Sequence, residues 1–288
     1  MKRLVSIILA LCFLGSLAQI KASDFEDHLK EVIEQSNKVY LIGYIKPFPT
    51  AIGTGMGGAL FHRGYSKTLP RFDVGLSATY VMIPEEDKYF GFKLPSGEKV
   101  QAPTAFGPSK TNNPMLIPGS DQNKFIVPVL HANIGLFANF EAMVRFATKD
   151  LGDFGRVNIY GGGLKYELSD LIPIPMFPID FGVQAAYHKL TLGDYLDSGT
   201  FSMNVQASGT LPHVPLGLYG GVGYDISSTT IKTMKLVPGT SLGDVTIDGK
   251  NGLRLNAGVS FTLLFLNVHA DYNIGTYKSI AGGVMIVF

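Results

Sequence analysis

Six ionisable residues stand out because they lie in segments where polar and apolar side chains alternate. All six fall on the polar side of that alternation, which would gather them on one face if the segments pair as strands. His269 and Asp271 would then lie near Ser260 and Ser279, and such a set can form a nucleophile, a base and an orienting group. The candidate residues are His131, Glu141, Arg145, Arg254, His269 and Asp271.

The motifs that would strengthen a catalytic interpretation are absent from the sequence. It contains no G-x-S-x-G or H-E-x-x-H motif, and its six histidines form no i, i+4 pair. The run 161–163 of three glycines lies inside an alternating segment, where it favours a bulge over a phosphate loop. We therefore predict a protein that is not an enzyme and holds no cofactor or metal. No basic cluster of the nucleic-acid-binding kind occurs either.

The alternation of polar and apolar residues recurs ten times along the chain. A period of two is that of a β-strand whose two faces meet different surroundings. The predicted strands cover approximately residues 72–83, 125–137, 139–148, 156–168, 179–191, 200–209, 216–228, 252–262, 265–274 and 278–288.

Several features favour a membrane barrel over a soluble sandwich. The runs are about ten residues long, which is what a tilted strand needs to cross the hydrocarbon. The connections alternate in length, and the two longest, 84–123 and 229–251, fall on the same side, as extracellular loops do. Only 16% of the residues are charged, below the usual ~25%. The predicted fold is all-β, an antiparallel transmembrane β-barrel of about ten strands, with eight or twelve as alternatives.

In such a barrel the apolar faces meet lipid, so the six candidate residues line the lumen. Tight turns set the register of two hairpins. A turn at Ala138 places His131 opposite Arg145, and a turn at Leu263 and Leu264 places Arg254 opposite Asn273. Lumen charges of this kind should pair, because an unpaired buried charge is costly. They form either a satisfied polar interior or the lining of a path for a ligand.

The N-terminal part of the chain differs from the rest. Residues 1–22 resemble a secretory signal peptide, with Lys2 and Arg3 ahead of an apolar run that contains the only cysteine, Cys12. An apolar stripe then predicts a short helix over about 24–40, and the Gly- and Pro-rich stretch 47–64 predicts irregular backbone. We expect residues 23–70 to plug or cap the periplasmic mouth of the barrel, which itself spans 71–288.

The sequence resembles an uncharacterised, domain-of-unknown-function family of bacterial outer-membrane β-barrel proteins common in Bacteroidetes and related groups. The resemblance covers most of the mature chain, implies fold and location, and brings no activity or site residues. Its strand and loop motifs are Phe72-Asp73-Val74, Phe90 after Pro84-Glu85-Glu86-Asp87, Ala102-Pro103-Thr104-Ala105-Phe106-Gly107, Met143-Val144-Arg145-Phe146 and Tyr160-Gly161-Gly162-Gly163-Leu164-Lys165-Tyr166.

The expected location is the bacterial outer membrane. The expected partners are outer-membrane lipid and the barrel-assembly machinery, which would read the last strand through its terminal Phe288. The leading functional hypothesis is a gated channel or binding barrel for a small solute, which could be apolar. The alternatives are a structural or surface-interaction barrel without transport and, third, a lipid-modifying enzyme. A continuous lumen would favour the first, and a filled lumen with ordered outer loops the second.

Overall fold

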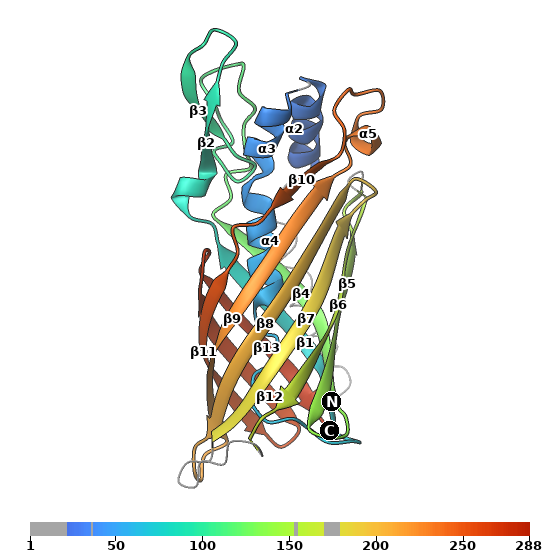
Figure 1. Cartoon of the computed structure of the whole chain (residues 1–288), viewed down its shortest axis with the longest axis vertical. Coiled ribbons are helices and arrows are strands. Elements are labelled where there is room, and N and C mark those ends of the chain that lie inside the picture. The colour runs from blue at the N-terminus through green and yellow to red at the C-terminus, as the bar shows by residue number, and fades with distance from the viewer. Residues whose placement is uncertain (1–21, 36, 153–154, 170–178) are drawn as a thin grey trace.

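The computed structural model describes residues 22–35, 37–152, 155–169 and 179–288. Its central feature is a closed antiparallel barrel of ten strands (Figure 1), in which each strand pairs with its neighbours and β8 pairs with β9 to complete the ring. The barrel strands are β1 (Phe72–Met82), β4 (Lys124–Gly135), β5 (Phe140–Asp150), β6 (Arg156–Glu167), β7 (Ile179–Leu192), β8 (Leu196–Thr210), β9 (Leu216–Ile231), β11 (Leu253–Leu263), β12 (Leu266–Ile274) and β13 (Ser279–Val287).

The prediction of ten alternating strands is confirmed. The largest difference is at β8 and β9, which extend further than predicted because their ladder continues to the pair Leu196 and Ile231. The predicted pairing of His131 with Arg145 is confirmed. The other predicted pairing is wrong, because Leu263 pairs with Leu266 and the turn lies one residue later than expected. Asn273 therefore pairs with Asn256, and since the shift is two residues, Arg254 keeps its inward face.

The outer surface of the barrel is apolar and its inner surface polar. Along β12, Leu266, Val268 and Tyr272 are exposed, whereas His269 and Asp271 between them are buried. The seam between the first and last strands is closed by Phe72 and Phe288, whose rings stack with centroids 4.5 Å apart. Among the described residues, no helix has the length and apolar character needed to cross a membrane.

The two ends of the barrel differ. The long-loop end carries connections 83–123, 193–195, 232–252 and 275–278, and the short-turn end carries 136–139, 211–215 and 264–265. The connections 151–155 and 168–178 include residues outside the described part of the chain. The two longest loops contain regular elements. They contain the 3-10 helix η1 (Glu85–Lys88), the hairpin β2 (Tyr89–Lys93) and β3 (Lys99–Pro103), the helix α5 (Thr233–Leu236), and β10 (Val245–Asp248), which extends the sheet beside β9.

Within the described residues from 22 onwards, three helices precede the barrel: α2 (Ala22–Glu34), α3 (Lys38–Ile45) and α4 (Pro47–Gly57). The helix predicted over about 24–40 is present as α2, but it ends at Glu34. A second helix, α3, begins at Lys38, where the Asn37 side chain caps it. The irregular backbone predicted for the Gly- and Pro-rich stretch is wrong over most of its length. Pro47 and Pro49 lie in the first turn of α4, where proline is tolerated.

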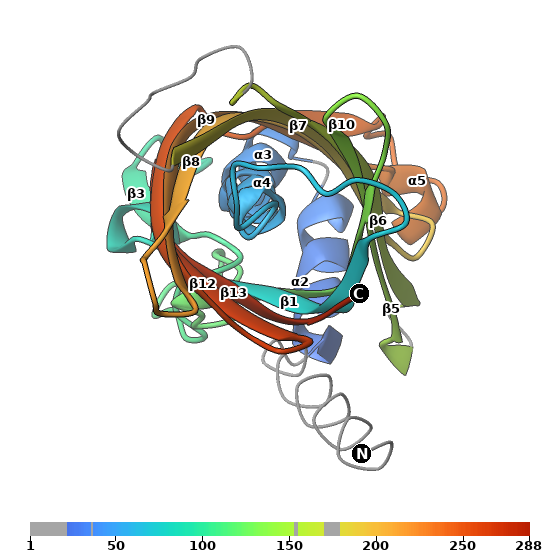
Figure 2. The same ribbon diagram turned by 90° about the horizontal axis from the view of Figure 1, so that it is seen from below.

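The N-terminal segment runs through the barrel. Seen along the barrel axis, α4 lies inside the ring of strands (Figure 2), where it packs against β1, β4, β8 and β9. Residues 58–71 continue to the short-turn end and join β1, and we call 47–71 the plug. Helices α2 and α3 lie at the long-loop end (Figure 1), where together with residues 83–123 they form what we call the cap. The lumen is thus plugged as predicted, while α2 and α3 lie at the end of the barrel opposite to the one where β1 begins. Residues 1–21 of the predicted signal peptide lie outside the described residues.

Candidate functional site

Glycines allow α4 to lie directly against the lumen wall. A Cβ atom on Gly53 would be 2.7 Å from Cβ of Ser227, and one on Gly55 would be 2.5 Å from Cγ2 of Val127. A Cβ on Gly57 would be 2.9 Å from the Asp225 carboxylate. Because side-chain atoms cannot approach this closely, the glycines are required by the narrow lumen, which explains their density in the sequence.

Arg145 of β5 holds the end of α4. Its guanidinium donates to the carbonyl oxygens of Met56 (3.1 Å) and Gly58 (3.0 Å), and also to that of Ala59. The last carbonyls of a helix have no partner within the helix and carry its negative dipole end. A buried cation at this position therefore satisfies the orphan acceptors and fixes the depth of the plug.

Below α4 the plug is joined to the wall by an ion-pair network. Arg63 of the plug contacts Asp73 (2.7 Å) and Glu141 (3.0 Å). Lys67 of the plug also pairs with Asp73, and Lys165 of β6 lies 3.3 Å from Glu141. All five side chains are nearly inaccessible. Breaking such a buried pair typically costs about 3–5 kcal/mol, because the remaining charge stays unpaired.

A histidine contact lies beside this network. The rings of His62 in the plug and His269 in β12 stack with centroids 4.3 Å apart. Arg63 Nη1 donates to His62 Nε2 over 2.8 Å, which makes this nitrogen an acceptor and places the proton of the neutral ring on Nδ1. The hydrogen bond between Arg63 and His62 thus depends on an unprotonated His62.

A second polar cluster belongs to the wall alone. Arg254 binds Asp225 at 2.8 Å and donates to Asn273 at 2.9 Å. Asp271 accepts from Asn273 at 2.6 Å and from the hydroxyl of Tyr219 at 3.0 Å. This cluster links β9, β11 and β12 across the lumen face.

The six candidate residues are all buried on the inner face, but they do not form one site. Glu141, Arg145 and His269 contact the plug. Arg254 and Asp271 belong to the wall cluster, and His131 bonds to Ser77 (3.2 Å) and Asn133 (3.1 Å) of the wall.

Sequence reasoning missed the plug's own contribution, His62, Arg63 and Lys67. The signal available was the abrupt change from apolar Leu60 and Phe61 to two ionisable residues within an otherwise apolar, Gly-rich stretch.

The serine, histidine and aspartate considered for catalysis do not form a relay. His269 Nδ1 bonds to Asn267 (3.0 Å), and Ser260 accepts from Asn267 (2.7 Å). Asp271 is engaged with Tyr219 and Asn273 instead. Within the described part of the chain, no cluster of three or more His, Cys, Asp or Glu side chains is arranged to hold a metal ion.

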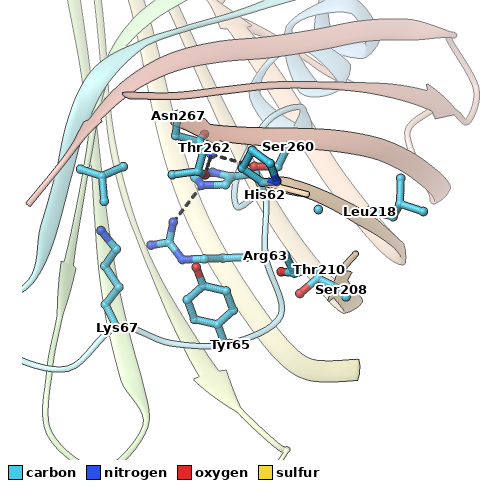
Figure 3. A pocket seen from close by; sticks show the side chains of 14 residues that line it. His62, Arg63, Tyr65, Lys67, Ser208, Thr210, Leu218, Ser260, Thr262 and Asn267 are labelled. Atoms are coloured by element: carbon cyan, nitrogen blue, oxygen red, sulfur yellow. Dashed lines mark hydrogen bonds between the residues drawn. The ribbon is translucent and has the colours of Figure 1, made fainter. Parts of the chain in front are cut away.

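The lumen is closed differently at its two ends. At the long-loop end, buried apolar side chains from the helices, the loops and the strand ends form one core, which includes Leu29, Ile33, Tyr44, Ile52, Phe106, Ile117, Val127, Ile159 and Ile231. At the short-turn end a polar pocket of about 220 Å³ lies between the plug and the wall (Figure 3). The arrangement can bind a polar group from that side, and the apolar core lies across the other end of the lumen.

Comparison with known proteins gives a family. No curated protein matches the sequence. Neisserial surface protein A is 13% identical, with 75% of this chain and 97% of that chain covered and a TM-score of 0.28. The translocator domain of the autotransporter NalP from Neisseria meningitidis is 10% identical, covering 80% and 90%, with a TM-score of 0.31. The outer membrane protease OmpT from Escherichia coli is 9% identical, covering 76% and 96%, with a TM-score of 0.35.

These solved structures are similar to the chain in fold alone. The sequence matches, over residues 1–288, a family described as a family of unknown function, DUF6588, and the chain belongs to that family.

Proposed function

We propose that the protein is a non-enzymatic outer-membrane barrel, sealed against transport, that presents its cap as a binding surface outside the cell. The observation that carries this proposal is the apolar core at the long-loop end, in which α2, α3 and α4 pack against the loops and the barrel wall. An apolar core packs at high density and excludes water. A lumen closed in this way supports presentation of the cap more than passage of a solute.

Contacts between the cap elements support a fixed binding surface. The ring of Tyr40 in α3 meets Phe90 and Phe92 of β2 edge-on, at 5.2 and 4.9 Å between centroids. Asp87 accepts from the Tyr277 hydroxyl and from Lys250, both at 2.7 Å. These bonds tie the hairpin to the rim of the barrel and leave the other face of the hairpin exposed, as at Tyr89 and Lys93. Such a preorganised surface suits a macromolecular partner.

A gated channel is the second candidate, and the polarity of the wall favours it. Among the described residues, both ring nitrogens of His188 are buried without a hydrogen-bond partner, as are the hydroxyls of Thr200 and Ser202. If the plug withdrew, these groups would line a hydrophilic passage. A polar wall of this kind suits a polar solute better than the apolar solute considered from the sequence.

A disulfide between plug and wall separates the two candidates. A Cβ atom at position 55 would lie 3.3 Å from Cβ of Val127, close to the ~3.8 Å typical of disulfides. The double variant Gly55→Cys, Val127→Cys also removes the Val127 methyl group that a Cβ at position 55 would strike. Cys12, in the predicted signal peptide, is the only native cysteine.

Current is measured in planar bilayers after co-flotation with lipid has verified insertion, with the wild-type chain under the same redox conditions as the control. The sealed barrel predicts no current in either the oxidised or the reduced state of the variant. Current that appears on reduction and disappears on oxidation would refute the sealed barrel and establish the gated channel.

A further inference from the structure

The polar pocket at the short-turn end is built from two parts of the chain. The plug contributes His62, Arg63, Tyr65 and Lys67, and the wall contributes side chains from β8, β9, β11, β12 and β13. In Figure 3 the plug residues face Ser208, Ser260 and Thr262 across the pocket. Its volume of about 220 Å³ exceeds the ~30 Å³ of one water molecule several times, so a small solute fits.

The pocket presents hydrogen-bond donors. Ser208 already accepts from the backbone N–H of Gly64 at 2.7 Å. Ser260 and Thr262 both accept from the side-chain amide of Asn267, each at 2.7 Å. A hydroxyl that accepts one bond still has its own hydrogen to donate. Nε of Arg63 is also buried without a partner among the described residues. The three hydroxyls can therefore each donate to a solute in the pocket.

The charged side chains that line the pocket are positive, which, like the hydroxyl donors, favours a negatively charged ligand. Arg63 and Lys67 line the pocket, and its lining includes no Asp or Glu. In the ion-pair network behind it, three cations, Arg63, Lys67 and Lys165, share the two carboxylates of Asp73 and Glu141. Glu167 accepts from the backbone N–H of Ser66 at 2.6 Å rather than from one of these cations. The side of the network that lines the pocket presents the cations Arg63 and Lys67.

We propose that this mouth pocket binds a small soluble oxyanion, a carboxylate or a phosphate group, from the side of the short turns. Hydroxyl donors and a guanidinium are the groups that recognise such anions in proteins. The site goes beyond the proposed sealed barrel, because it needs neither an open lumen nor a partner at the cap. It gives the closed barrel a ligand on the face opposite the cap.

The test is isothermal titration of inorganic phosphate into the purified full chain in non-ionic detergent. The wild type should bind phosphate saturably, with one site per chain. Thr262→Asp keeps an acceptor for Asn267 but places a negative charge in the pocket, and should weaken binding at least about tenfold. Thr262→Asn, of the same size without the charge, should change it less than about threefold. Thr246→Asp, an equally exposed threonine at the long-loop end, should leave it unchanged.

Absence of saturable binding to the wild type, or equal binding by the Asp and Asn variants at position 262, would overturn the proposal. The protein reconstituted in nanodiscs that contain phosphatidylglycerol should bind phosphate as the detergent-solubilised protein does. If the protein in these nanodiscs no longer binds phosphate, the ligand of the pocket is a lipid headgroup and not a soluble anion. Because calorimetry measures no current, failure here is distinct from failure of the sealed-barrel proposal in the bilayer test.

Discussion

Arg145 shows how much a single lumen residue controls. It is buried in the barrel wall, and its guanidinium donates to three backbone carbonyls at the end of α4. A cation in this position is stable because the helix end concentrates partial negative charge. The residue therefore links the barrel wall to the depth at which the plug sits.

Replacing Arg145 with Met should destabilise the protein by about 2–4 kcal/mol, because three buried carbonyls lose a charged donor. The measurement is the guanidinium unfolding midpoint in detergent. Arg156→Met is the matched control, since Arg156 lies 3.8 Å from Asp150 with both side chains about two-thirds exposed. An exposed pair of this kind contributes at most ~1 kcal/mol. Equal losses in both variants would contradict the anchoring role of Arg145.

At the residue scale, the sequence predicted which side chains point into the barrel better than it predicted their hydrogen-bond and ion-pair partners. The period of two correctly directs His131, Glu141 and the other candidate residues inward, because it follows from strand geometry alone. Their partners depend on register and on what occupies the lumen. Arg254 was placed opposite Asn273 from an assumed turn, and the turn lies one residue later. The strand pattern does not predict that Arg63, ten residues before Asp73, lies inside the barrel and forms an ion pair with it.

At the element scale, the cap is a small core built on helices and loops. Burial raises the pKa of Tyr40 and Tyr44 in α3, and that of Tyr195 and Tyr277 in the rim loops. Tyr44 donates to the carbonyl of Pro118 at 3.1 Å. A tyrosine whose pKa is higher in the folded state than its unfolded value stabilises the fold fully below that unfolded value, ~10. The contribution is lost as the pH rises above it.

The cap should therefore loosen at alkaline pH. We expect the Tm in detergent to be flat between pH 7 and 9 and to fall between pH 10 and 12. Tyr44→Phe should reduce the size of that fall, since one buried phenol no longer ionises. Tyr160→Phe, which removes a hydroxyl from the exposed outer face, should not. An identical alkaline fall in all three proteins would show that the buried phenols are not responsible.

Elements with a strong period were predictable, and those specified by their surroundings were not. The ten strands follow from alternation that persists over about ten residues each. Helix α4 contains Pro47 and Pro49 and three glycines within 53–57, a composition that argues against a helix by propensity. It forms because the wall surrounds it and its glycines fit there, which is tertiary context overriding local preference.

At the scale of the whole molecule, the plug places α3 and Phe288 at opposite ends of the barrel (Figure 1). If the long loops face outwards, as in other barrels of this kind, the helices of the cap lie outside the cell. The sequence pattern predicts the opposite location for these helices. A segment that directly precedes the first strand is expected to lie at the end of the barrel where that strand begins.

Cysteine labelling on intact cells checks this orientation. Lys38→Cys in α3 should react with a membrane-impermeant maleimide, because Lys38 is exposed at the long-loop end. Val214→Cys, exposed in a short turn, should react only after the outer membrane is permeabilised. The reverse labelling pattern would place the cap in the periplasm and contradict the proposal that the cap is a binding surface outside the cell.

The seam between β1 and β13 has a consequence for biogenesis. The plug leads directly into β1, and the ring is complete when β1 pairs with β13 and Phe72 stacks on Phe288. If the barrel closed first, the plug helix would have to enter along the barrel axis, past the side chains that project into the lumen. The strands must instead wrap around a segment that already occupies their axis, so the earliest part of the chain serves as the template on which the later part is assembled.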